Sequence, residues 1–97
     1  MNTLDALLTQ VDAVGEDLLA LEQALVRIPS VNTGSMPTGN ETQVCELVGD
    51  WLAEDGIASE VLGRVPERGN IIARMEGRSG KAGLMFMSHT DVVPVED

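Results

Sequence analysis

The sequence has few of the residues on which several classes of protein depend. It contains one tryptophan, one phenylalanine, no tyrosine and a single cysteine in 97 residues. An internal disulfide needs two cysteines, and a structural zinc site of the Cys type needs several, so both are excluded. We interpret Cys45 as a small, partly buried helix residue. A reactive thiol is the alternative, but no neighbouring histidine or basic residue is evident to lower its pKa.

Positive charge is also scarce. Six basic residues stand against 16 acidic ones, which gives a formal net charge of −10. This balance disfavours nucleic acid and anionic membrane surfaces as partners, because both are themselves negative. The first residues carry no positive charge and no continuous apolar run follows, so no secretory signal is visible, and no run is long enough to cross a bilayer. We expect a cytoplasmic protein.

Hydrophobic residues make up 43% of the chain, enough for one small domain with a core. Apolar spacing predicts helices at about 4–14, 16–28 and 41–55. The first helix has Thr3 as its expected cap. Its apolar stripe is expected to pack on its own domain, with a surface for a partner helix as the alternative. The stripe consists of Leu4, Leu7, Leu8, Val11 and Val14.

The helix at 41–55 has the clearest signals at both ends. Asn40 and Gln43 have the spacing of a capping box, and Gly56 is placed to end the helix. Trp51 lies on the apolar face of this helix, so we expect it in the core rather than stacked on a ligand.

Strands are expected at about 57–62, 70–75 and 83–89, the first two close enough for an antiparallel pair. The predicted fold class is therefore α/β, with two or three helices packed on a small mixed sheet of at least three strands. Residues 29–39 are predicted to form a loop. The Gly80-Lys81 pair does not fit a phosphate-binding loop, because Met75 and Ala82 stand where such a loop needs glycine and serine or threonine.

The chain's only histidine occurs in the sequence His89-Thr90-Asp91. It follows the apolar run 84–87 and precedes Pro94, so we expect it at the carboxyl end of a strand, where α/β folds commonly bind ligands. A histidine that ligates a metal usually gives its other N–H to a carboxylate, and Asp91 is placed to be that carboxylate. Without further context, a hydrogen-bonded structural pair is the competing interpretation.

Three segments, in order, resemble one family. Residues 25–32, 70–77 and 85–95 are similar to the opening segments of the M20 metallopeptidases, which include acetylornithine and succinyl-diaminopimelate deacylases, aminoacylases and glutamate carboxypeptidases. The resemblance implies that residues 1–97 are the amino-terminal part of one zinc-peptidase-like catalytic domain. It also implies that His89 is a zinc ligand and that Asp91 is the active-site carboxylate that orients it.

The resemblance further implies a hydrolase that cleaves a peptide or N-acyl amino acid amide bond. One or two Zn²⁺ ions, with Co²⁺ as a substitute, and a homodimer of the complete protein belong to the same expectation. The family's other ligands and its general base have no counterpart before Asp97, so we expect this chain to be inactive alone. The alternative is a non-catalytic α/β interaction module or a truncated remnant.

Overall fold

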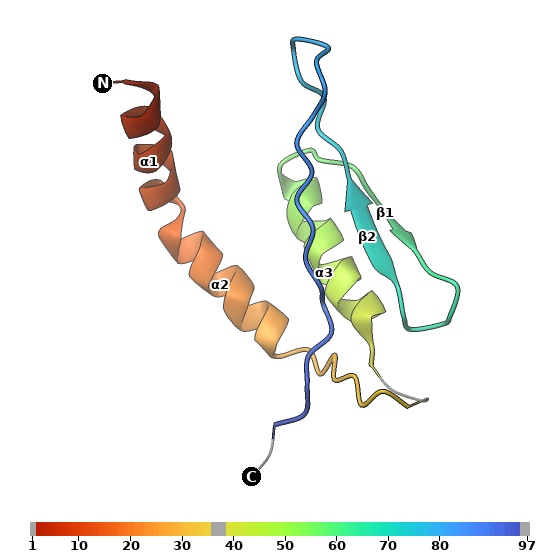
Figure 1. Cartoon of the computed structure of the whole chain (residues 1–97). Coiled ribbons are helices and arrows are strands. Elements are labelled where there is room, and N and C mark those ends of the chain that lie inside the picture. Colours follow the sequence, from red (N-terminus) through yellow and green to blue (C-terminus); the bar gives the residue numbers. More distant parts are fainter. Residues whose placement is uncertain (1, 36–38, 96–97) are drawn as a thin grey trace.

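The computed structural model describes residues 2–35 and 39–95. Within these ranges three helices precede a single β-hairpin, which is followed by an extended carboxyl-terminal segment (Figure 1). The helices are α1 (Thr3–Ala13), α2 (Gly15–Val26) and α3 (Glu41–Glu54), and the strands are β1 (Ser59–Leu62) and β2 (Asn70–Ala73). The expected α/β class and all three helices are confirmed. The predicted loop at 29–39 is irregular over its described part, and residues 36–38 lie outside the described residues.

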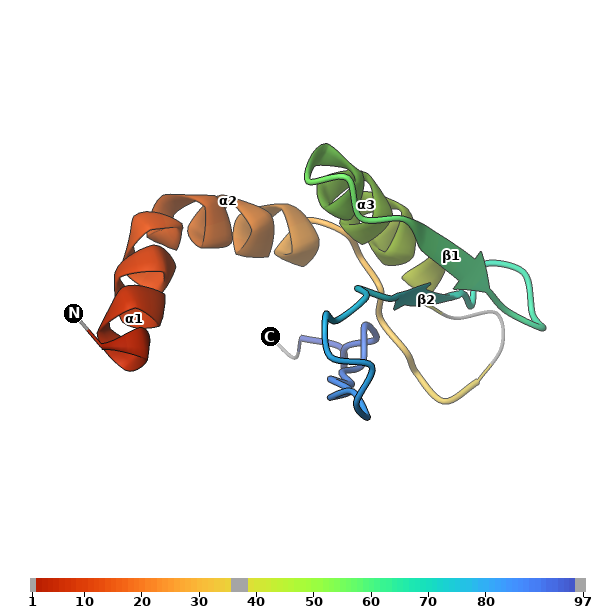
Figure 2. The same ribbon diagram turned by 90° about the horizontal axis from the view of Figure 1, so that it is seen from above.

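The two strands form an antiparallel pair, as predicted, in which Glu60 faces Ile72 and Val61 faces Ile71. Helix α3 packs against both strands, and Figure 2 shows α3 on one side of the hairpin and the end of the chain on the other. The core lies between α3 and the hairpin. Val44 and Cys45 are its buried apolar residues, at 5% and 0% exposure. Trp51 is half-buried on the same helix, consistent with a core position.

Close approach of α3 to the hairpin requires glycine at position 69. A Cβ atom there would come within 2.8 Å of Val61 Cγ1 and 2.9 Å of Thr42 Oγ1. The Gly69 N–H donates instead to Thr42 Oγ1 at 2.9 Å, and the Gly69 carbonyl accepts from the Cys45 thiol at 3.4 Å. Burial and the nearby Glu41 and Glu46 charges raise the pKa of the Cys45 thiol, so Cys45 is a structural residue rather than a reactive thiol.

The predicted third strand at 83–89 is wrong. Residues 82–91 are extended but belong to no β-ladder among the described residues, and the sheet is antiparallel rather than mixed. The four apolar side chains of the segment stay in solvent, with exposures of 78–89% for Leu84, Met85, Phe86 and Met87. The local pattern favours a strand, but a strand also needs a hydrogen-bonded neighbour, and the edge of β2 does not provide one here.

The expected packing of the first apolar stripe is also wrong. Neither α1 nor α2 has a buried residue, and Leu4, Leu7, Leu8 and Val11 are 52–62% exposed. In Figure 1 the two helices lead away from α3 and the hairpin. The reason is area: strands of four residues offer too small a sheet for more than one helix, and α3 already covers it.

Two predicted caps differ in detail. Asn2, not Thr3, caps α1, because its Oδ1 accepts the Asp5 N–H at 2.8 Å. The Asn40 side chain makes no capping hydrogen bond, so the predicted capping box is wrong, although α3 does begin after Asn40. Gly56 has φ +74 and follows the last turn of α3, as expected for a residue that ends a helix in the left-handed conformation.

The fold exposes much more surface than a compact chain of this size. Its accessible surface is 8484 Å², whereas a compact monomer of the same mass exposes roughly 5,400 Å². The radius of gyration is 16.3 Å, against about 12.5 Å for a compact domain of this length. The exposed apolar residues of α1, α2 and segment 84–87 contribute to this larger surface. They have no packing partner among the described residues.

Shortening a buried side chain of the small core should destabilise the fold. We expect Val44→Ala to lower the free energy of unfolding by about 2 kcal/mol, because two buried methyl groups are lost and a cavity remains. Urea denaturation followed by the Trp51 fluorescence measures it. Val26→Ala is the matched control, since Val26 is also helical but 78% exposed. Equal losses for the two variants would contradict the core assignment.

The exposed segment 84–87 should bind apolar probes. We expect Phe86→Glu to reduce fluorescence of an anilinonaphthalene dye and to reduce self-association, because it breaks an apolar patch that is 89% exposed at Phe86. Dye titration and sedimentation velocity measure the two effects. Ser79→Glu adds the same charge in the preceding turn and should change neither the dye fluorescence nor the self-association. If both variants have equal effects, the added charge rather than the loss of the apolar patch is the cause.

Candidate functional site

Two segments far apart in the sequence hold the site together. Residues 30–32 and 90–92, here called the clamp, are joined by a parallel bridge between Val31 and Val92. The Asn32 N–H donates to the Val92 carbonyl at 2.8 Å, and the Val92 N–H donates to the Ser30 carbonyl at 3.0 Å. The Ser30 hydroxyl, 3% exposed as a residue, donates to the Thr90 carbonyl at 2.7 Å. The clamp fixes the backbone immediately around Asp91.

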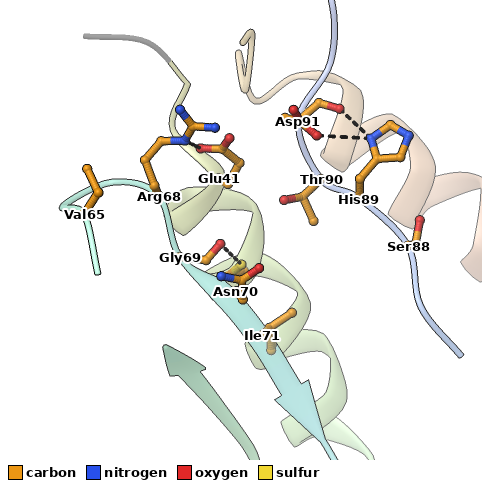
Figure 3. A pocket seen from close by; sticks show the side chains of 11 residues that line it. Glu41, Val65, Arg68, Gly69, Asn70, Ile71, Ser88, His89, Thr90 and Asp91 are labelled. Carbon is orange, nitrogen blue, oxygen red and sulfur yellow. Dashed lines mark hydrogen bonds and ion pairs between the residues drawn. The ribbon is translucent and has the colours of Figure 1, made fainter. Parts of the chain in front are cut away.

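The structure brings the predicted pair His89 and Asp91 into contact. His89 Nδ1 lies 2.8 Å from the Asp91 carbonyl oxygen and 3.2 Å from Asp91 Oδ1. Dashed lines in Figure 3 mark the two contacts. A carbonyl oxygen can only accept a hydrogen bond, so Nδ1 must carry the hydrogen. In the neutral ring Nε2 is then the nitrogen with a free lone pair. The His89 side chain is 83% exposed, so this nitrogen is accessible.

The position of the pair differs from the prediction. His89 does not end a strand but lies in the extended segment 82–91, and the clamp takes the place of a β-ladder in holding it. The contact between His89 and Asp91 follows from their spacing, because residues two apart in extended backbone point to the same side. Their metal and catalytic roles stay predictions.

Sequence reasoning missed Asn32. Its Nδ2 donates to Asp91 Oδ2 at 2.9 Å, while its Oδ1 accepts the Gly34 N–H at 2.8 Å. The second bond fixes which end of the amide faces Asp91, because a backbone N–H requires an oxygen as its partner. The only available signal was that Asn32 lies in a polar loop within the segment that resembles the M20 family, and nothing local links it to a residue 59 positions away.

The surroundings of Asp91 favour its ionised form. The hydrogen bond from Asn32 is the largest effect that lowers the pKa of the Asp91 carboxyl, and the neighbouring His89 lowers it further, while partial burial opposes both. The carboxylate uses one oxygen for each neighbour: Oδ2 accepts from Asn32, and Oδ1 lies next to His89. An ionised carboxylate is an acceptor only, which again favours the hydrogen on His89 Nδ1.

Beside the pair lies an open hollow of about 420 Å³. His89 and Asp91 line one wall, and the start of α3 and the end of the hairpin connection line the other (Figure 3). On that opposite wall Arg68 Nε lies 2.8 Å from Oε2 of Glu41, whose side chain is only 7% exposed. The pair is electrostatic, since Glu41 Oε2 accepts no well-aligned hydrogen bond. The hollow thus combines an accessible imidazole with charged groups of both signs.

These residues fit one metal ligand, not a complete metal site. His89 offers Nε2, and Asp91 orients the ring in the way that carboxylates orient ligating histidines. Within residues 2–35 and 39–95 there is no group of three or more His, Cys, Asp or Glu side chains that could hold a metal. A catalytic zinc needs about three protein ligands. Further ligands would have to come from outside the described residues.

Comparison with known proteins finds similarity to part of the acetylornithine deacetylases of several bacteria. The chain is 32% identical over 83 residues to acetylornithine deacetylase of Edwardsiella ictaluri, an alignment that covers 81% of this chain and 21% of the relative. It is 36% identical over 59 residues to acetylornithine deacetylase of Vibrio cholerae, covering 61% and 15%, and 31% identical over 81 residues to that of Vibrio atlanticus, covering 81% and 21%.

The similarity is limited in extent. The chain spans about a fifth of the length of the curated relatives it matches. No family model matches it, and no solved structure matches it.

In the part of the chain that the structure describes, no helix is long and apolar enough to span a bilayer.

The effect of Asn32 on Asp91 can be measured directly. We expect Asn32→Ala to raise the pKa of the Asp91 carboxyl, because the mutation removes the hydrogen bond that stabilises the ionised form. In the original chain the folded-state pKa is lowered. The stabilisation is therefore fully present above the unfolded-state pKa and is lost as the pH falls through the folded-state pKa.

Carbon-13 NMR titration of the Asp91 carboxyl gives the midpoint for each protein. Asn70→Ala is the control, because Asn70 also borders the hollow but its side chain bonds to the Leu62 carbonyl rather than to Asp91. An Asp91 midpoint that is the same with and without the Asn32 side chain would contradict the assigned cause.

Proposed function

We propose that this chain is the part of a zinc-dependent amidohydrolase of the M20 type that supplies His89 as a metal ligand and Asp91 as the carboxylate that orients it. One observation carries the proposal: Nδ1 of the only histidine is occupied by the Asp91 carbonyl and carboxylate, which leaves Nε2 exposed with a free lone pair. The similarity to acetylornithine deacetylases supports the same assignment.

The substrate class we propose is an N-acyl amino acid or a short peptide. When bound, zinc polarises a substrate carbonyl and lowers the pKa of a water molecule. In this scheme Asp91 holds the His89 ring in one tautomer, and the clamp holds Asp91. The general base and the remaining ligands would lie in residues beyond these 97, so the chain alone should not turn over substrate. A second metal ion, Co²⁺ as a substitute and a homodimer of the complete protein remain part of the proposal.

The exposed surfaces fit such a part of a larger domain. The surface exceeds that of a compact monomer by roughly 3,000 Å², more than one side of a typical protein interface buries. Residues of the remaining polypeptide would cover α1, α2 and segment 84–87. The same surfaces also favour the second candidate, a non-catalytic module that binds another protein. Dependence of metal binding on His89 distinguishes the two.

The test joins this chain to the part of the Vibrio cholerae acetylornithine deacetylase that follows the matched region. Zinc content after dialysis and acetate release from N-acetylornithine are measured for the joined protein and its variants. We expect His89→Ala to lose bound zinc and nearly all activity. We expect Asp91→Asn to weaken zinc affinity by roughly 10–100-fold, the usual effect of removing a carboxylate that orients a ligating histidine.

Two controls make the outcome interpretable. Calorimetric zinc titration of the 97-residue chain alone should show no tight binding, because it offers one ligand. Glu60→Gln, on the exposed surface of β1, should leave zinc content and activity of the joined protein unchanged. Zinc content that does not depend on His89 in a folded, active joined protein would refute the metal assignment and favour the non-catalytic module.

A further inference from the structure

We propose that Asn32 is a positioning residue that acts through Asp91 to set the ring tautomer of His89. This inference rests on the proposed function only in taking Nε2 as the atom that binds a metal. The effect of Asn32 on the tautomer is a property of this chain alone. Among the described residues Asn32 makes a hydrogen bond to Asp91 and none to His89, so a hydrogen-bonded path from Asn32 to the ring runs through the carboxylate between them.

The hydrogen-bond polarity runs in one direction along these three residues. The Gly34 N–H fixes Asn32 Oδ1, so Nδ2 of Asn32 must face Asp91. Asp91 Oδ2 accepts from that amide, and its other oxygen is left to face His89 Nδ1 at 3.2 Å. Rotation of the carboxylate would break one contact or the other. The orientation of Asn32 is thereby transmitted to the hydrogen on Nδ1.

Asn32 also holds the backbone that contacts the ring. Its own N–H donates to the Val92 carbonyl, one residue beyond the Asp91 carbonyl that lies 2.8 Å from His89 Nδ1. The side chain and the backbone of Asn32 therefore both fix Asp91, one at its carboxylate and one next to its carbonyl. Without the side-chain contact, the carboxylate is free to turn and the ring has one acceptor fewer for the Nδ1 hydrogen.

An isosteric substitution isolates this effect. In Asn32→Asp the new carboxylate can still accept the Gly34 N–H, but it presents an oxygen to Asp91 where a donor stood, and two carboxylates repel. In the double variant Asn32→Asp/Asp91→Asn the polarity is restored. The amide at position 91 can donate to position 32 and still present its oxygen to His89 Nδ1.

The readout is long-range proton–nitrogen-15 NMR of the imidazole at a pH where the ring is neutral. The chain has a single histidine, so one set of ring signals reports the tautomer without assignment. We expect the original chain to be mainly in the Nδ1–H form. In Asn32→Asp the ratio of Nδ1–H to Nε2–H should fall by roughly fivefold, the effect of losing one net hydrogen bond. The double variant should recover the original ratio.

Two further measurements test whether a change in the tautomer ratio comes from loss of the clamp or from the added charge alone. Hydrogen exchange of the Val92 amide, which donates to the Ser30 carbonyl, reports whether the clamp remains formed in each variant. Asn70→Asp adds the same charge at the edge of the hollow without a bond to Asp91 and should not change the ratio. A purely structural role of Asn32 would change amide protection but not the tautomer of the clamped state.

An unchanged tautomer ratio in Asn32→Asp with a protected Val92 amide would overturn the inference, because the Asp91 carbonyl would then set the tautomer alone. If the single variant loses the clamp, failure of the double variant to recover the ratio overturns the inference as well. Zinc content of the joined protein tests the proposed function separately. A tautomer change without His89-dependent zinc would leave the positioning role standing and remove the metal role.

Discussion

The site depends on the clamp between residues 30–32 and 90–92. Four hydrogen bonds join these segments, two between backbones and two from the side chains of Ser30 and Asn32. At a net value near 1 kcal/mol each, they stabilise the contact by about 4 kcal/mol. Closing a flexible loop of this length costs on the order of 4 kcal/mol. The stabilisation by the hydrogen bonds and the cost of closing the loop nearly cancel. The clamp therefore needs the intervening chain to be ordered already.

Helix α3 and the hairpin supply that order. They fold the chain between the two segments back on itself, so that less of it remains flexible when the clamp forms. Several polar contacts attach the start of α3 to the residues just before β2: Gly69 bonds to Thr42 and Cys45, and Arg68 pairs with Glu41. Four of these residues also line the hollow opposite His89, namely Glu41, Cys45, Arg68 and Gly69. The small core and the wall of the candidate site are therefore the same structure.

Helices were predictable because their signals are local. Apolar residues at helical spacing and a glycine after the last turn define α3 within its own segment, and the same period gives an apolar face of Val44, Leu47, Val48, Trp51 and Leu52. The hairpin followed from two short β-rich runs. The prediction for 83–89 failed because an apolar run indicates only that a segment is suited to a buried strand, and pairing depends on a neighbour that its own sequence does not specify.

The prediction that the apolar stripe of α1 packs on its own domain failed for a related reason. An amphipathic pattern shows that one face of a helix is apolar, but not which surface covers it, and among the described residues none covers α1 or α2. At the site, His89 and Asp91 could be paired from their spacing in extended backbone. Ser30 and Asn32 could not, because 59 or 60 residues separate them from their partners.

The sequence by itself determined the α/β class, the positions of the helices and of the hairpin, and the residue pair that offers an imidazole next to a carboxylate. Each of these follows from residues within one turn or a few positions of one another. Only the tertiary structure decided which nitrogen of His89 is left free, which groups hold Asp91, and that segment 84–87 stays unpaired. These depend on contacts between distant segments, and such contacts form only where the fold supplies both partners at hydrogen-bonding distance.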